Sequence, residues 1–203
     1  MDQRYETGSF PLTLRAPGGW RGRAISVALL TSGWLLLGSC GDDPYYVEWD
    51  QGTDTVDLYS LQNTRPGLFN AFDFVNGYPV LLEVLGATGN WDVAVGGDAQ
   101  GLTLLPTGAL GIETTSGVKR VSGALADVTR APQDSTEYVR IASVPLELGA
   151  TYIIRTRVHA NTSGETTCIF YAKMQPLTID VETLRVRFVY GSNPNCGDTD
   201  LEP

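Results

Sequence analysis

Apolar and polar residues alternate with a period of two along residues 151–159. This period is typical of a β-strand with one buried face and one half-exposed face. The buried face is expected to carry Tyr152, Ile154, Thr156 and Val158. The half-exposed face is expected to carry Ile153, Arg155, Arg157 and His159. A chain that repeats this pattern is limited to folds whose sheets bury one side of each strand.

Several other segments carry strand signals, among them residues 184–190, which alternate in the same way. Their inward face is expected to consist of Leu184, Val186, Phe188 and Tyr190. Residues 168–174 are more uniformly apolar, which favours a central strand. The remaining candidates are residues 45–49, 53–59, 68–75, 78–85, 91–95 and 138–143, separated by turn residues. The sequence therefore predicts an all-β fold, a single antiparallel β-sandwich or barrel-like domain, with at most one short helix at residues 122–130.

An export pattern precedes this domain. Arg21 and Arg23 flank an apolar segment at residues 24–37, which leads through Gly38 and Ser39 into Cys40. The segment is shorter than the ~20 residues of a membrane-spanning helix, and its order of charge, apolar run and small residues is typical of a signal peptide. Cys40 resembles the lipidated cysteine of bacterial lipoproteins, in which a Leu-x-small-Cys box directs acylation and cleavage just before the cysteine. The alternative is a buried core helix, which apolar runs of this length also form.

Cleavage before Cys40 divides the chain into a signal peptide (1–39), a lipidated tether (40–44), an all-β domain (45–192) and a loose acidic tail (193–203). Four of the 14 basic and two of the 23 acidic residues precede Cys40, so the mature chain carries 10 and 21, a net charge of −11. This charge repels phosphate backbones, so nucleic acid is not an expected partner. Gly41 stands where aspartate acts as an inner-membrane retention signal in the best-known bacteria. The resemblance therefore implies a protein anchored in the outer membrane, facing the periplasm or the medium.

Two cysteines remain when Cys40 is assigned to lipid. An exported chain enters an oxidising compartment, so Cys168 and Cys196 are expected to form a disulfide. The alternative is that Cys168 is an ordinary core residue of the strand at residues 168–174. The sequence contains no C-x-x-C pair and no cluster of cysteine and histidine, so we predict neither a metal site nor a cofactor.

The sequence offers little support for catalysis. There is no G-x-S-x-G nucleophile motif, no glycine-rich phosphate loop, and one histidine, His159, which is expected at a solvated strand position. A carboxylate-based hydrolase needs two carboxylates across a cleft, and Asp73, Glu83 and Glu113 lie within strand-like segments. Because no spacing selects them, we predict no catalytic residues and a non-enzymatic protein.

Two further leads concern binding. Residues 50–57 and 193–200 offer oxygen ligands near glycines, but neither matches a calcium-binding loop, and turn chemistry explains both. Tyr45, Tyr46 and Trp49 lie close together in the sequence, where packing is a simpler role than a stacking platform for a ligand.

Three segments resemble HmuY-like lipoproteins, a family of all-β haem-scavenging proteins of bacterial envelopes. They are Asn90-Trp-Asp-Val-Ala-Val95, Phe170-Tyr-Ala-Lys-Met-Gln175 and Val186-Arg-Phe-Val-Tyr190, within residues 70–190. In that family a Tyr-Ala-Lys strand pairs with the final strand near the C-terminus. The haem-binding member uses two histidines, whereas this chain has His159 alone, outside any matching motif. The resemblance therefore implies the fold but not the haem site.

The sequence thus predicts a lipid-anchored envelope lipoprotein that acts as a non-enzymatic binding or interaction module. The resemblance weakly favours a haem-like or other hydrophobic small molecule as its ligand. Two alternatives remain open: a small carboxylate-based envelope hydrolase, and an accessory subunit of a membrane assembly with an envelope protein as its partner. A binder should show a concave apolar pocket, an enzyme converging ionisable groups, and a subunit a flat apolar patch.

Overall fold

The computed structural model describes residues 46–50, 54–113, 116–160 and 167–203. The predicted signal peptide, the tether and Cys40 lie outside the described residues. All the described residues belong to one compact unit, Asp43–Pro203. None of them forms a helix long and apolar enough to cross a membrane.

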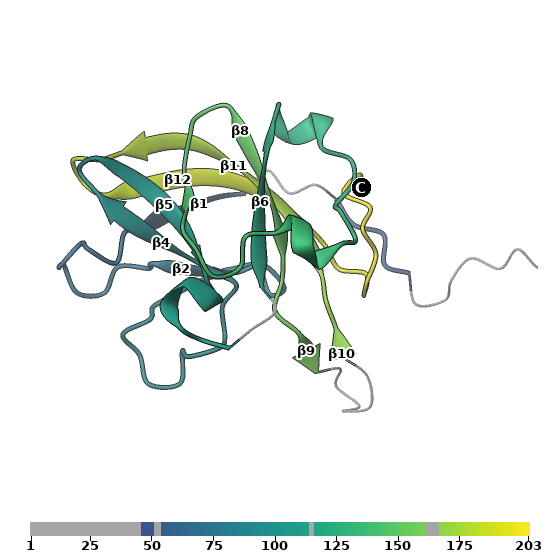
Figure 1. Ribbon diagram of the computed structural model, residues 1–203, viewed down its shortest axis with the longest axis horizontal. Coiled ribbons are helices and arrows are strands. Elements are labelled where there is room, and N and C mark those ends of the chain that lie inside the picture. Colours follow the sequence, from purple (N-terminus) through teal and green to yellow (C-terminus); the bar gives the residue numbers. More distant parts are fainter. Residues whose placement is uncertain (1–45, 51–53, 114–115, 161–166) are drawn as a thin grey trace, which may run out of the picture. The chain divides into compact units, whose positions relative to one another are not determined.

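Two five-stranded antiparallel sheets make up this unit (Figure 1). The first sheet has the order β1 (Thr55–Tyr59), β12 (Arg185–Asn193), β11 (Tyr171–Asp180), β8 (Ala150–Arg155), β6 (Gly117–Ser122). The second has the order β3 (Tyr78–Val80), β2 (Ala71–Asp73), β4 (Val93–Asp98), β5 (Gly101–Pro106), β7 (Val144–Pro145). A separate ribbon pairs β9 (His159–Ala160) with β10 (Thr167–Cys168). The predicted all-β sandwich is confirmed.

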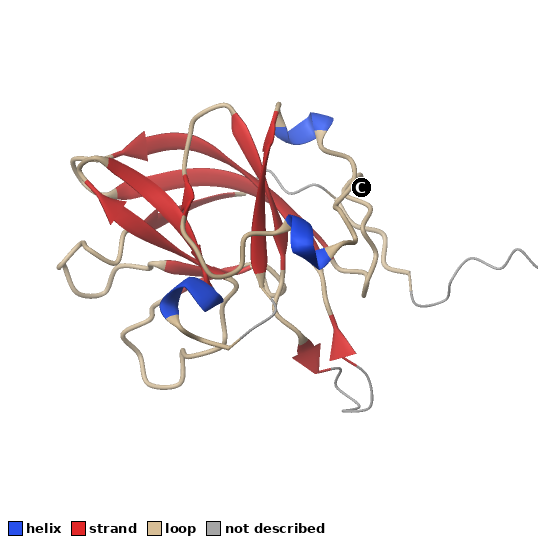
Figure 2. Ribbon diagram, in the orientation of Figure 1, coloured by secondary structure: helices blue, strands red, loops and turns tan. Residues whose placement is uncertain are grey.

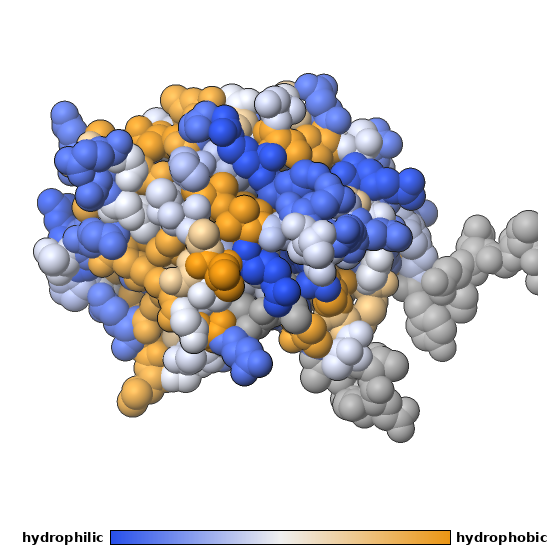
Figure 3. All heavy atoms as spheres, in the orientation of Figure 1, coloured by the Kyte–Doolittle hydropathy of each residue, from blue (hydrophilic) through white to orange (hydrophobic). Residues whose placement is uncertain are grey.

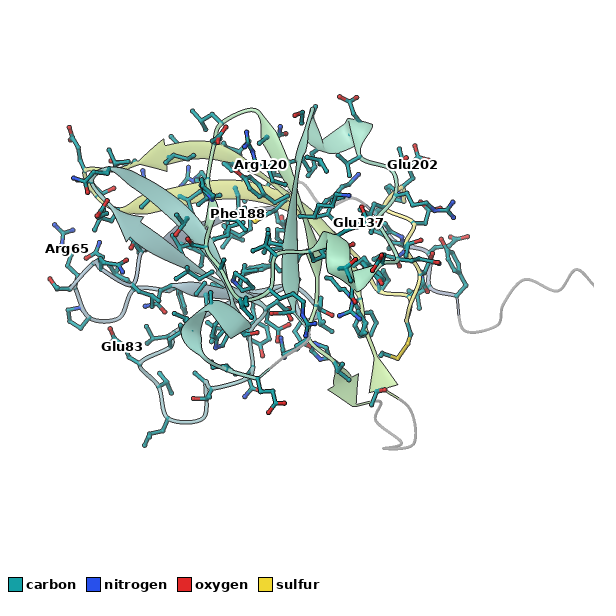
Figure 4. The ribbon with its side chains drawn as sticks, viewed as in Figure 1. Arg65, Glu83, Arg120, Glu137, Phe188 and Glu202 are labelled. Carbon is teal, nitrogen blue, oxygen red and sulfur yellow. A yellow bond between two sulfur atoms is a disulfide. The ribbon has the colours of Figure 1, made fainter. Side chains whose placement is uncertain are left out.

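The main core lies between the two sheets, as expected for a β-sandwich. Val186 and Phe188 of β12 are fully buried in it, which confirms the inward face predicted for residues 184–190. Phe188, which is labelled in Figure 4, meets Phe72 of the opposite sheet edge to face, with ring centroids 5.5 Å apart. The pairing of β11 with β12 places Met174 opposite Tyr190. β11 and β12 are therefore neighbours in the first sheet, a pairing that only the family resemblance had implied.

Parts of the outer faces of both sheets are also covered, which the alternation of residues 151–159 did not predict. Ile153 was expected on a half-exposed face but is 2% exposed. It packs with Tyr171, Val128 and Leu201, which come from the neighbouring strand, from the segment after β6 and from the C-terminal segment. On the second sheet, Trp91 and the small residues beside it form a corresponding outer cluster. Where both faces of a strand are covered, the side chains on both faces are buried.

The prediction that residues 193–203 form a loose tail is wrong. Leu201 is fully buried, and its amide donates to the carbonyl of Thr129. Asn193 is also fully buried, and its side-chain amide donates to Asp198 and to the carbonyl of Asp200. Asp and Asn serve here as partners within a folded turn, so their polarity was misread as disorder.

Several predicted boundaries differ from the structure. The expected helix at residues 122–130 is a single 3-10 turn, η2 (Leu125–Asp127). The described residues form three such turns, the others being η1 (Thr107–Leu110) and η3 (Ser135–Glu137) (Figure 2). Residues 138–143 contribute only a bridge from Val139 to Val118, and residues 46–49 have no strand pairing. The candidate at residues 78–85 ends at Val80. β5 and β6 were not predicted, although β5 alternates buried Leu102 and Leu104 with less buried neighbours.

A disulfide joins Cys168 to Cys196, with 5.2 Å between their Cα atoms. The predicted pairing is therefore present in the structure. It connects the β9–β10 ribbon to the C-terminal segment that covers the first sheet.

Cys168→Ala is expected to lower the free energy of unfolding by about 3.5 kcal/mol, because the bond closes a loop of 28 residues in the unfolded chain. Denaturant titration of both proteins without reductant measures the difference. In excess dithiothreitol the two proteins should unfold alike. Equal stability under both conditions would show that the bridge does not form in solution.

Candidate functional site

A pocket of about 400 Å³ lies where loops of the two sheets meet. We call it the arginine pocket, and its lining residues are Gly89, Thr107, Ile112, Glu113, Arg140, Arg157 and Val158. They come from the β3–β4 loop, from η1 and the residues after it, from the segment before β7, and from the connection between β8 and β9. Ile112 and Val158 supply apolar side chains, and Val158 is 42% exposed.

Arg157 lines this pocket and is bonded to two buried carboxylates. Its Nη1 donates to Asp92 at 3.0 Å and its Nη2 donates to Asp73 at 2.8 Å. Its backbone amide also donates to Asp92 at 3.0 Å. Both aspartates are fully buried, whereas the Arg157 side chain keeps 12% exposure. The arginine is therefore fixed in place and still borders the pocket.

Local chain geometry creates the two aspartate positions. Asp73 ends β2, where its carboxylate accepts the backbone amides of Val75 and Asn76 and the side-chain amide of Asn76. Asp92 precedes β4, and its second oxygen accepts the amide of Phe74 at 2.8 Å. Every carboxylate oxygen of the pair thus has at least one donor. Removing these groups from water is costly unless all of them are bonded, and here they are.

Burial and charge act differently on the two carboxyl groups. Burial raises the pKa of Asp92 and outweighs the opposing attraction of Arg157. Burial also pushes the pKa of Asp73 upward, but hydrogen bonds from Arg157 and Asn76 outweigh it, so this pKa lies below its ordinary value. Burial lowers the pKa of the neighbouring His159, and the positive charge of Arg157 adds to the effect. His159 is thus favoured in its neutral form.

His159 does not occupy the solvated position that the sequence analysis expected. It is half-buried, and its ring meets Phe170 edge to face with centroids 5.8 Å apart. Its Nε2 is buried without a hydrogen-bond partner among the described residues. The strand ends at Arg155, and the backbone turns so that Thr156 pairs with Phe170, which takes His159 away from the sheet surface.

Asp73, Asp92 and His159 offer ligand atoms that all lie within 4.8 Å of one another. Such a set of oxygen and nitrogen donors is suited to a divalent cation. The carboxylates are already bonded to Arg157, however, and a cation at this point would have to displace the guanidinium. The chemistry of this donor set therefore favours an internal ion-pair network over a metal site.

Two glycines determine where the chain of Arg140 runs. A Cβ on Gly108 of η1 would lie 2.4 Å from the carbonyl oxygen of Arg140, and one on Gly117 of β6 would lie 2.8 Å from the Cβ of Tyr138. Neither position has room for a larger residue. The glycines let the segment before β7 lie close against η1 and β6, which brings Arg140 to the pocket wall.

Of the other described residues that the sequence singled out for chemistry, Glu113 lines this pocket, and Glu83, Tyr46, Trp49 and Asp57 do not. Tyr45 lies outside the described residues. Glu83 lies on the exposed β3–β4 loop (labelled in Figure 4). Tyr46 is 49% exposed and Trp49 half-buried, and both line a separate hollow of about 560 Å³ with Glu48, Asp50 and Pro203. Asp57, from the rejected calcium segment, pairs with Arg187 at 2.7 Å.

Sequence reasoning named Asp73, Glu113, Arg157 and His159 but did not bring them together, and it missed Asp92 and Arg140 as site residues. Asp92 lies within Asn90-Trp-Asp-Val-Ala-Val95, which was noted only for its resemblance. Nothing in a single sequence links residues 73, 92 and 157, because their proximity depends on how the two sheets pack.

Comparison with protein-family models, with curated proteins and with solved structures finds no match to this chain.

Proposed function

We propose that this chain is a lipid-anchored envelope lipoprotein whose β-sandwich is a non-enzymatic binding module, with the arginine pocket as its ligand site. The observation that carries the proposal is the pocket itself. At about 400 Å³ it lies within the size range of small-molecule sites, and it combines apolar side chains with a few fixed polar groups. Arg157 is held by Asp73 and Asp92, so its donors are already oriented before a ligand binds.

The lining favours a small hydrophobic molecule with a polar end over a haem-like macrocycle. Haem iron requires an axial ligand, commonly histidine. His159 is not among the residues that line the pocket, and its Nε2 is buried beside Asp73 and Asp92. We therefore propose a ligand other than haem, although the resemblance to HmuY-like proteins weakly favours haem.

Binding is also a better proposal than hydrolysis. A glycosidase of the carboxylate type uses two carboxyl groups that flank its substrate. Among the described residues that line the pocket, Glu113 is the one carboxylate, and Asp73 and Asp92 are covered and bonded to Arg157. The network stabilises the pocket wall and has no carboxylate oxygen without a donor.

An accessory subunit remains a second candidate because of the β3–β4 loop. Leu85 is fully exposed there and Val84 is 55% exposed, and Tyr78 of the preceding strand β3 is 47% exposed. The face seen in Figure 3, however, intersperses apolar residues with hydrophilic ones, whereas docking surfaces are more continuous. We place this candidate second for that reason.

The proposed compartment depends on Cys40, which lies outside the described residues. Acylation there would attach the Asp43–Pro203 unit to the outer membrane by a short tether, facing the periplasm or the medium. The net charge of the mature chain, −11, argues against nucleic acid as a partner.

Pocket binding can be measured with N-phenyl-1-naphthylamine, a small uncharged dye that fluoresces in apolar surroundings. The soluble Asp43–Pro203 unit, which contains all three apolar clusters, is titrated with the dye. We expect saturable binding to one site. Val158→Trp fills the pocket and should weaken binding about tenfold or more, because the dye loses the apolar area that it buries.

Leu148→Trp is the matched control, since Leu148 is 61% exposed and does not line the pocket. It should leave dye binding unchanged. Equal dye binding by wild type and Val158→Trp would contradict the proposal. A haemin titration in parallel should give no Soret shift at micromolar haemin, and a saturating shift would restore the haem alternative.

A further inference from the structure

We infer that the arginine pocket takes a small zwitterion, either a free amino acid or a short peptide with an apolar side chain. The inference rests on the proposed function and names the class of ligand for the same site. Three features of the lining support it: guanidinium donors on the wall, a carboxylate at the rim, and apolar side chains beside them.

Guanidinium groups supply the donors. A guanidinium has five N–H donors, and Asp73 and Asp92 use two of those on Arg157. The exposed part of the Arg157 side chain borders the pocket, and Arg140 adds a second guanidinium to the wall. Planar guanidinium groups match the geometry of a carboxylate, so one end of the ligand is expected to be a carboxylate.

The charges around the pocket argue against a simple anion. Among the described residues, Arg140 and Arg157 carry positive charge at the pocket, and Glu113, Asp73 and Asp92 carry negative charge at or beside it. The carboxylates therefore offset the attraction of the guanidinium groups for an anion. A ligand with only a negative charge would enter a site that does not attract it, within a mature chain of net charge −11.

A zwitterion matches a pocket that has side chains of both charges, because it carries one charge of each sign. Its carboxylate would face the arginines and its ammonium group would face Glu113, which is exposed at the pocket rim. Ile112 and Val158 would contact an apolar side chain. The volume of about 400 Å³ admits an amino acid or a short peptide.

A displacement experiment tests this with four matched probes and the soluble Asp43–Pro203 unit loaded with N-phenyl-1-naphthylamine. The probes are L-leucine, the dipeptide Leu-Leu, 4-methylpentanoate and 3-methylbutylamine. The last two keep the leucine side chain but lack the amine or the carboxylate. We expect at least one zwitterion to displace the dye about tenfold more effectively than either singly charged analogue. Which of the two zwitterions is stronger separates a free amino acid from a peptide.

Glu113→Gln identifies the residue that selects the zwitterion, and Glu83→Gln is its control on an exposed loop. Glu113→Gln should reduce the preference for the zwitterion over 4-methylpentanoate about tenfold, whereas Glu83→Gln should leave it unchanged. Arg140→Gln should weaken displacement by the zwitterion and by 4-methylpentanoate alike. A preference that survives Glu113→Gln would contradict the assignment of Glu113.

The two proposals fail in different ways. Dye binding that Val158→Trp does not alter would contradict the pocket as a ligand site. Dye binding that depends on the pocket, combined with 4-methylpentanoate displacing as well as the zwitterions, would overturn the zwitterion and leave the binding module standing. No displacement by either zwitterion at about 10 mM would also overturn it, since a pocket that binds zwitterions this weakly is not a specific site for them.

Discussion

Replacing Asp92 by alanine is expected to lower the free energy of unfolding by about 3–5 kcal/mol. Asp92 is fully buried and accepts the backbone amides of Phe74 and Arg157 as well as the Arg157 guanidinium. The variant leaves all three donors without this acceptor at a largely buried position. The guanidinium accounts for the largest part of the lost stability, because it loses one of its two carboxylate partners.

Chemical denaturation of the Asp43–Pro203 unit at neutral pH measures this effect, and Asp57→Ala is its control. Asp57 also pairs with an arginine, Arg187, but on an exposed strand face where such pairs contribute about 0–1 kcal/mol. We expect the two variants to differ by at least 2 kcal/mol. Equal effects would mean that the Asp73–Arg157–Asp92 network does not support the pocket wall.

Replacing Cys40 by serine is expected to abolish acylation completely. Two or more acyl chains hold a protein on a membrane, and serine has no thiol to receive the first of them. Cells fed radiolabelled palmitate should label the wild-type chain and not the Cys40→Ser variant. Labelling that persists in the variant would contradict the lipid anchor.

Cys168→Ser provides the comparison for this measurement. Cys168 is bonded to Cys196, so its replacement should leave acylation at Cys40 intact while removing the disulfide. Loss of label in both variants would point to a folding or export defect instead of a specific acylation site.

The sequence predicted the fold class well because alternation records which side of a strand meets the main core. Val186 and Phe188 are buried where the pattern placed them, and Tyr152 and Ile154 are too. Alternation carries no information about whether a loop covers the other face. Ile153 was misassigned for that reason.

The site was less predictable than the fold because its parts come from distant segments. Asp73 and Asp92 belong to the second sheet, whereas Arg157 follows a strand of the first. Their contact depends on the packing of the two sheets. The C-terminal segment was misread for a related reason: its Asp and Asn residues resemble a solvated tail, but Cys196 and Leu201 fix it to the domain.

Mapping the dye on the protein by NMR tests the pocket most directly. A ¹⁵N-labelled Asp43–Pro203 unit is titrated with N-phenyl-1-naphthylamine, and the backbone amide shifts are followed residue by residue. We predict that the largest shifts fall on Gly89, Thr107, Ile112 and Val158, which line the arginine pocket. Shifts confined to the apolar hollow around Val84 and Leu85, or no saturable shifts at all, would contradict the account.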